Sequence, residues 1–169
     1  GIANPKWSHG NQLRFLEVMS EKQEKTKKIY VNFNVSTNPP ARYDCLKKIS
    51  DHYPLHKQKN YPNAVSIQDH NNFVESTQKD YLRDIAKSYF TVSPIGNGFD
   101  CHKTWEAIYM KSVPIVTRWH GVEIFKKLGI PILIIDDWSD LKDLDLSPDV
   151  YNKLWQDFKP SSLNFEFFK

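Results

Sequence analysis

One stretch of the chain, Ser93 to Val116, constrains the fold more than any other. It follows a β-rich run at Lys87 to Val92 and contains Gly96-Asn97-Gly98, whose glycines favour positive φ and a close backbone approach to a ligand. Asp100 is placed to cap a helix from about Cys101 to Lys111, and a further strand follows that helix. A strand, a glycine loop and a helix N-terminus together favour anion binding, because the loop amides and the helix dipole face the ligand.

The helix of this stretch has two different faces. His102 and Glu106 are four residues apart and share one face. Trp105, Ile108 and Tyr109 share another. The pattern predicts an apolar face against a sheet and a polar face beside the glycine loop. A simpler interpretation is also open, in which Gly-Asn-Gly marks a turn without a ligand and Glu106 is an exposed helix residue, because the loop fits neither GxGxxG nor a P-loop.

The run SPxGNGxDCHxTWEAxxxxxxPIV, from Ser93 to Val116, resembles the donor-binding motif of exostosin-like glycosyltransferases of GT-B architecture. In the wider GT-B group the same place holds a glycine-rich loop, a helix with an acidic residue and a strand that begins with Pro. The helix Glu of those enzymes accepts hydrogen bonds from the ribose hydroxyls of the nucleotide sugar. Glu106 matches that residue by its spacing to Pro114-Ile115-Val116. The resemblance implies a C-terminal, donor-binding domain.

The resemblance is strong as far as Asp137 and weaker over Ile29 to Ile49. It departs from the family at one position. Many GT-B enzymes carry a second acidic residue eight positions before the helix Glu, and this chain has Gly98 there. The resemblance then implies that Asp100 or His102 takes part of that role.

A second junction of strand, loop and helix lies nearer the N-terminus. Lys28 to Val35 alternates apolar and polar residues and predicts a strand. Ser36 to Pro40 forms the loop, and Ala41 to His52 forms the helix. Arg42 lies at the helix end that disfavours a cation unless an anion neutralises it, so it is either a clamp for a diphosphate or a surface residue. The resemblance includes this TNPPAR turn.

Strands and helices alternate along the rest of the chain. The expected elements are a short helix within Asn11 to Lys28, a loop from His52 to Asn72 with a weak strand at Ala64 to Ile67, a helix in the later half of Phe73 to Ala86, a short helix at Gly121 to Leu128, a buried strand at Pro131 to Ile135, a short helix at Ser139 to Leu144 and a last helix from Ser147. This order predicts a Rossmann-like α/β fold, with a mostly parallel sheet and helices on both faces. Ligands of such folds bind at the carboxyl ends of the strands. Four loops are expected to converge there: Ser36 to Arg42, Ser93 to His102, Arg118 to His120 and Asp136 to Trp138.

Two carboxylates, Asp136 and Asp137, follow the last buried strand. Such a pair at a strand end is able to hold Mg²⁺ or Mn²⁺, which leaves a metal-dependent phosphotransfer or hydrolase domain as an alternative. No third ligand is close in sequence, and enzymes of the resembled group do not generally rely on such a site. We therefore expect no metal site here and no requirement for a divalent metal.

Length and composition set the domain organisation. The 169 residues, 40% of them hydrophobic, suit one globular domain over 1–169. Within it, 1–27 are expected to be a lead-in or interdomain segment with a short helix, and 145–169 a C-terminal helix and tail. Trp7 in the lead-in either plugs the edge of the core or lies near an interdomain cleft. A net charge of +3 gives no reason to expect nucleic acid as a partner.

Compartment signals are few. Two cysteines are too few for a disulfide framework, which favours a reducing, cytoplasmic location. Asn34-Val35-Ser36 is an N-glycosylation sequon, but it falls in an expected ligand loop, which disfavours a secretory lumen. No apolar run approaches the roughly 18 residues that a membrane span needs. The chain begins with Gly1, which fits an excised piece, and an N-terminal acceptor domain is then expected elsewhere.

Together these features predict a glycosyltransferase domain of glycan biosynthesis that binds a UDP- or GDP-sugar and supports transfer of the sugar to a hydroxyl of a glycan or other acceptor. A non-catalytic nucleotide-sugar-binding module is the second alternative. The catalytic base is not identified, and His102 is the best local candidate for contact with sugar or phosphate. The expected nucleotide-sugar site comprises Thr37, Asn38, Arg42, Ser93, Gly96, Asn97, Gly98, Asp100, His102, Thr104, Glu106 and Arg118.

Overall fold

The structure, a computed structural model, describes residues 12–58, 61–66 and 78–159. Trp7, the last residue of the predicted weak strand (Ile67) and the tail from 160 lie outside the described residues. The elements, in chain order, are α1 (Gln12–Ser20), β1 (Lys27–Tyr30), β2 (Asn32–Asn34), the 3-10 helix η1 (Val35–Thr37), α2 (Pro39–Ser50), β3 (His56–Gln58), β4 (Tyr61–Ser66), α3 (Gln78–Ala86), β5 (Ser88–Val92), α4 (His102–Tyr109), β6 (Val113–Thr117), α5 (Glu123–Lys127), β7 (Leu133–Ile135), the 3-10 helix η2 (Trp138–Asp143) and α6 (Pro148–Gln156). No helix within the described ranges is long and apolar enough to cross a membrane.

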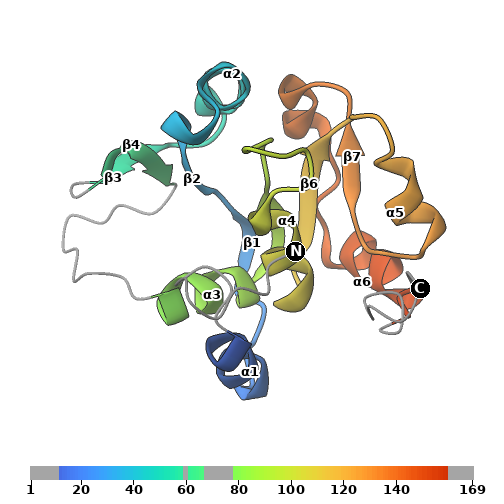
Figure 1. The fold of residues 1–169 in the computed structure, drawn as a ribbon. Helices are drawn as coiled ribbons and strands as arrows, with labels where there is room; N and C mark the ends of the chain where they lie inside the picture. The colour runs from blue at the N-terminus through green and yellow to red at the C-terminus, as the bar shows by residue number, and fades with distance from the viewer. Residues whose placement is uncertain (1–11, 59–60, 67–77, 160–169) are drawn as a thin grey trace.

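The main sheet has the strand order β1-β5-β6-β7, and all three pairings are parallel. It stands at the centre of the molecule in Figure 1, with helices on either side. Parallel neighbours need crossover connections, and α3, α4 and α5 supply them between successive elements of the sheet. The predicted Rossmann-like α/β fold with a mostly parallel sheet is therefore confirmed.

The two faces of the sheet bury different clusters. Ile29, Phe90 and Ile115 face a cluster that also contains residues of α2 and η2, with α6 packed against it. Tyr30 faces a second cluster made with α1, α3 and α4. Neighbouring residues of one strand thus enter opposite cores, as the period of two requires. Full burial of a side chain such as Ile115 contributes roughly 1.5–3 kcal/mol, so both helix layers are held by apolar packing.

The strand predicted over Lys28 to Val35 divides at Val31. Its first part, β1, joins the parallel sheet, and its second part, β2, pairs with β4 in a separate antiparallel sheet of order β2-β4-β3. The prediction of a loop from His52 to Asn72 is therefore wrong for β3 and for the first half of β4, which form an antiparallel pair. The weak strand predicted at Ala64 to Ile67 overlaps the second half of β4. Periodicity placed Val31 and Phe33 correctly in the core. It could not show that the chain changes partner strand between them.

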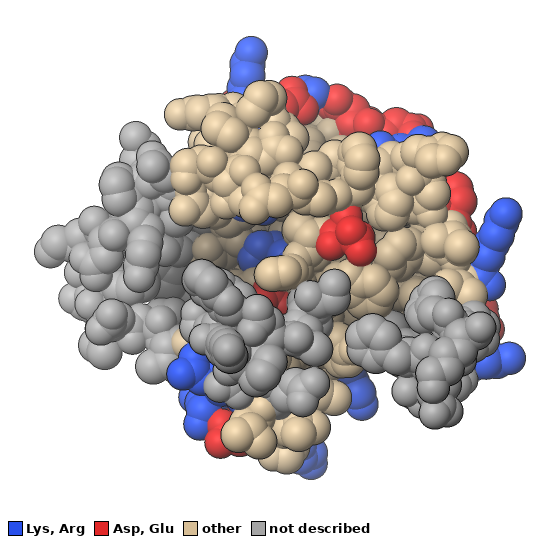
Figure 2. Space-filling view, in the orientation of Figure 1, with Lys and Arg blue, Asp and Glu red and all other residues tan. Residues whose placement is uncertain are grey.

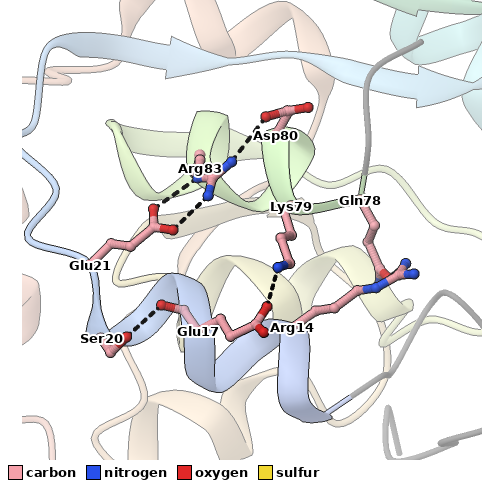
Figure 3. Close-up of polar contacts among 8 residues, drawn as sticks. All are labelled: Arg14, Glu17, Ser20, Glu21, Gln78, Lys79, Asp80 and Arg83. Carbon is pink, nitrogen blue, oxygen red and sulfur yellow. Dashed lines mark hydrogen bonds and ion pairs between the residues drawn. The ribbon is translucent and has the colours of Figure 1, made fainter.

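The second face is closed at its edge by α1, which lies beside α3. Arg83 pairs with Glu21 at 2.6 Å, and Lys79 pairs with Glu17 at 2.5 Å, so charged side chains line the seam between the two helices (Figure 3). Each such exposed pair contributes about 0–1 kcal/mol. The buried Phe15 of α1 contributes more by packing in the second cluster. This helix pair matters for the site because α3 also contacts α4.

Candidate functional site

The four loops predicted to converge lie together in the structure. Three follow the parallel strands β5, β6 and β7, and the loop Ser36 to Arg42 follows β2 of the antiparallel sheet. Asn38 caps α2 and donates a 2.9 Å hydrogen bond from its side chain to the carbonyl of Gly96. The beginning of α2 is thereby joined to the glycine loop. Phe99, which is 57% exposed, stacks on Trp119 with ring centroids 5.7 Å apart. This stack joins the glycine loop to the loop after β6.

The contacts continue around the sheet edge. Arg118 donates to Asp136 at 2.6 Å and also pairs with Glu123. Lys48 of α2 donates to Asp137 at 2.5 Å. The loops after β6 and β7 are thus linked to each other and back to α2. Figure 2 shows a hollow in the face of the molecule, with Lys or Arg atoms and Asp or Glu atoms at its floor.

Arg42 on α2 is buried, with 6% of its surface exposed, so the interpretation as a surface residue is wrong. Its Nε donates to the carbonyl of Ile95 at 3.0 Å and its Nη1 to the carbonyl of Asn34 at 2.7 Å. Burial lowers its pKa, because the charged form loses water. Among the described residues no carboxylate forms an ion pair with it. Arg42 therefore clamps two loops and carries a charge that no described acidic residue neutralises.

The two glycines of the loop differ in function. Within the described residues, positive φ occurs at Lys111, Gly121 and Gly129 and at neither Gly96 nor Gly98, so the predicted left-handed conformation is wrong. A Cβ at Gly96 would lie 3.0 Å from Nη2 of Arg42 and 3.2 Å from Cβ of Cys101. Gly96 is thus needed because the guanidinium packs against its backbone. A Cβ at Gly98 would meet its nearest atom at an ordinary 3.7 Å.

Helix α4 begins one residue later than expected. Cys101, and not Asp100, is its N-cap residue, and its side chain makes no capping hydrogen bond. Asp100 is exposed and instead accepts a 3.4 Å bond from the indole of Trp105. The positive end of the helix dipole is therefore left without a side-chain cap, as at helix ends that bind anions.

Ser93 and Thr104 are buried and bond to each other at 2.9 Å. The Ser93 hydroxyl also lies 3.3 Å from the sulfur of Cys101. These groups tie the end of β5 to the first turn of α4. Their hydroxyls are used within the protein, so they hold the backbone of the loop in place.

Glu106 does not share a solvent-facing surface with His102. His102 is exposed, whereas Glu106 is only 3% exposed. Its carboxylate accepts a 2.6 Å hydrogen bond from the hydroxyl of Tyr81 on α3. The predicted polar face is wrong because α3 packs against α4 and covers the turn that carries Glu106.

Lys103 lies beside this pair. Its ammonium donates to the Tyr81 hydroxyl at 2.7 Å and lies 4.6 Å from the centre of that ring. Burial lowers the pKa of Lys103 to about 8, although the nearby Glu106 acts in the opposite direction. Burial and Glu106 raise the pKa of Tyr81 well above its usual value. Lys103 is thus a second cation near the glycine loop without an ion-pair partner among the described residues.

The remaining predicted residues lie at the rim or beside it. Asn97 is exposed, and Thr37 is exposed with its methyl group directed near Gly96. The carboxylates of Asp136 and Asp137 are engaged by Arg118 and by Lys48 and Ser139. Asp137 also caps η2. In the described ranges, no group of three His, Cys, Asp or Glu residues is arranged to hold a metal ion.

Sequence reasoning missed Tyr81 and Lys103 as members of the site. The helical period places Tyr81 on the apolar face of its helix, and nothing in the pattern pairs it with a residue 25 positions later. Lys103 precedes Thr104 in the motif, but an isolated Lys in a helix is usually solvated. The stacked Phe99 and Trp119 were also missed, since an exposed aromatic residue in a loop gives no signal of its partner.

One family description, RXYLT1 C-terminal domain, matches residues 12–149. No curated protein gives a significant match to the chain. The matched range contains both strand–loop–helix junctions and the whole parallel sheet. It agrees with the resemblance to the C-terminal domain of exostosin-like glycosyltransferases. The chain therefore belongs to the RXYLT1 C-terminal domain family, a glycosyltransferase-related family.

Proposed function

We propose that this domain binds the diphosphate and ribose of a nucleotide-sugar donor and supports transfer of the sugar to an acceptor hydroxyl. The observation that carries the proposal is the pair of buried or partly buried cations beside the glycine loop, Arg42 and Lys103. Neither has an ion-pair partner among the described residues. The uncapped N-terminus of α4 adds positive potential at the same place.

A buried charge without a counter-charge costs several kcal/mol, so a protein rarely retains one such as Arg42 without use. The charge of Lys103 is partly balanced by Glu106, to which Tyr81 links it. The carbonyls of Asn34 and Ile95 compensate part of the cost at Arg42. A diphosphate would supply the missing negative charge to the guanidinium, the ammonium and the helix end together. The leaving nucleoside diphosphate gains negative charge as the sugar departs, and fixed positive groups stabilise that state most.

The residues that contact the ribose and the sugar of the donor are assigned from the chemistry of their side chains. Glu106 supplies a carboxylate for the ribose hydroxyls, in line with the family resemblance. His102, exposed at the start of α4, is placed to contact the sugar or a phosphate. The binding site for the acceptor and the general base are supplied by a second domain, since a GT-B enzyme closes two Rossmann-like domains on its substrates. No divalent metal is required, because Arg42, Lys103 and the helix end carry the positive charge.

Calorimetric titration of the full-length protein with UDP, GDP and their sugars tests the proposal. We expect one nucleotide class to bind, and its sugar to bind at least as well. Lys103→Met should weaken binding about tenfold, as expected for a lost hydrogen bond to a charged group. Lys126→Met, an exposed change on α5, is the matched control and should leave affinity unchanged. Absence of binding to all these nucleotides at millimolar concentration would reject the donor site.

Two rival functions have distinct tests. A non-catalytic binding module would bind the same nucleotide but give neither transfer nor donor hydrolysis in the full-length protein. A metal-dependent hydrolase or phosphotransferase would use Asp136 and Asp137 and lose activity in excess chelator. The ion pairs of these two carboxylates with Arg118 and Lys48 favour a structural use of both. We therefore expect nucleotide binding and transfer to persist in chelator.

A further inference from the structure

Tyr81, Lys103 and Glu106 form a hydrogen-bonded series between two helices. Tyr81 comes from α3, and the other two lie one helical turn apart on α4. The distances are 2.7 Å from the Lys103 ammonium to the Tyr81 oxygen and 2.6 Å from that oxygen to the Glu106 carboxylate. The second distance is typical of a hydroxyl that donates to a charged oxygen.

The chemistry of the three groups fixes the direction of both hydrogen bonds. An ammonium group has donors and no acceptor, so the Tyr81 oxygen must accept from Lys103. Its single proton is then directed at Glu106. The Tyr81 ring is itself held, since its edge meets the ring of Tyr30 with centroids 6.1 Å apart. One oxygen of the Glu106 carboxylate is therefore fixed in position by a rigid donor.

We propose that Tyr81, oriented by Lys103, is a positioning residue that aims the Glu106 carboxylate at the ribose hydroxyls and so sets the preference for ribose over deoxyribose nucleotides. This inference rests on the proposed donor site. A carboxylate that turned freely would lose orientational freedom on meeting the two hydroxyls. One that is already fixed on one side meets them at a smaller cost. Tyr81 contributes to selectivity without touching the nucleotide.

A merely structural hydrogen bond would behave differently. In that case the Tyr81 hydroxyl would only join α3 to α4, and its removal would lower thermal stability without changing how the protein distinguishes nucleotides. The measured quantity must therefore be a ratio of two affinities of one variant. A general loss of folded protein or of diphosphate binding cancels in such a ratio.

The experiment titrates UDP and GDP, each against its 2′,3′-dideoxy counterpart, into wild-type full-length protein and into Tyr81→Phe. We expect the wild type to prefer the ribose form about tenfold or more. In Tyr81→Phe the preference should fall at least about threefold, whereas affinity for the dideoxy form should stay nearly constant. Tyr109→Phe removes a hydroxyl from the same helix α4 and is the matched control, which should keep the wild-type ratio.

The outcomes separate the proposed function from this inference. If the wild type binds none of these nucleotides, the proposed function fails and the inference fails with it. If the wild type binds but Tyr81→Phe keeps the wild-type ratio, only the inference is overturned. If Tyr81→Phe does not fold, Lys103→Met probes the same series from its other end. A lower ratio in that variant supports the proposal, and an unchanged ratio overturns it.

Discussion

Tyr81 on α3 donates a 2.6 Å hydrogen bond to Glu106 on α4, and this contact buries the residue that the motif presents as its acidic ligand group. The bond joins two helices that cover the same face of the sheet. Glu106 is therefore held by the tertiary structure. Changes at this residue are expected to affect folding as well as binding.

Glu106→Gln should lower the free energy of unfolding by about 1–1.5 kcal/mol, because a hydrogen bond to a charged group is replaced by a weaker, neutral one in a buried place. Nucleotide affinity should fall about tenfold or more. Urea unfolding and calorimetric titration measure the two effects. Glu24→Gln, at an exposed position, is the control. Unchanged stability would mean that the charge of Glu106 adds nothing to its contact with Tyr81.

Gly96→Ala and Gly98→Ala form a matched pair within one loop. The new Cβ at Gly96 would lie 3.0 Å from Arg42 and 3.2 Å from Cys101, so the clamp must move, at a cost of about 1–3 kcal/mol. The Cβ at Gly98 has only an ordinary contact at 3.7 Å, and its effect should stay within about 0.5 kcal/mol. Chemical denaturation of both variants gives the comparison. Equal losses would contradict the packing of Arg42 against Gly96.

Arg42→Lys should destabilise the domain by about 2 kcal/mol or more. A lysine has no planar fork with which to reach the carbonyls of Asn34 and Ile95 together, so at least one charged hydrogen bond is lost. Lys47→Met, an exposed change on the same helix, is the control. Urea midpoints of the two variants measure the difference. If Arg42→Lys is as stable as the wild type, the loops do not depend on the clamp.

Lys103→Met should change the pH dependence of stability. The folded state releases the Lys103 proton near pH 8, and the unfolded state releases it near its usual value of 10.5. The unfolded state therefore binds more protons between these pH values, and the free energy of unfolding of the wild type rises with pH across that window. The methionine variant lacks this rise.

Urea unfolding of both proteins at pH 7, 8.5 and 10 is the measurement. Methionine should be most favourable relative to lysine below pH 8, and the difference should narrow toward pH 10. A difference that does not vary with pH would show that folding does not lower the pKa of Lys103.

Asp137→Asn should lower the melting temperature near neutral pH but not in strong acid. The hydrogen bond from Lys48, followed by those from Ser139, holds the pKa of Asp137 far below its usual value. Its stabilising contribution is therefore present above about pH 4 and is lost as the pH falls through the acid range. Melting temperatures of wild type and variant should differ at pH 6 and converge below pH 3. Asp143→Asn, a change at an exposed position of the same 3-10 helix, is the control and should leave the melting temperature nearly unchanged at both pH values.

The sequence by itself determined the alternation of strands and helices that builds the parallel sheet and the edge at which the loops of the candidate site meet. Alternating residues such as Ile29, Val31 and Phe90 are buried as the period of two predicts. Each apolar side chain gains free energy when it leaves water, whichever segment covers it, so the pattern of one segment is enough to predict its burial. Turn residues were also informative. Ser147 begins its helix by a capping bond that needs only neighbouring residues. The predicted loop from Ser36 to Pro40 is too long, because Asn38 caps α2 and the helix starts at Pro39.

Only the tertiary structure decided which charges meet. Arg42 reaches a carbonyl 53 residues away, and Tyr81 reaches a carboxylate 25 residues away. The division of the predicted strand at Val31 has the same origin, since the choice between β5 and β4 as partner depends on segments distant in sequence. Periodicity reports the burial of one segment. It carries no information about which segment packs against it. Glu106 was expected to be exposed, and it is buried because Tyr81 of α3 packs against it and donates a hydrogen bond to it.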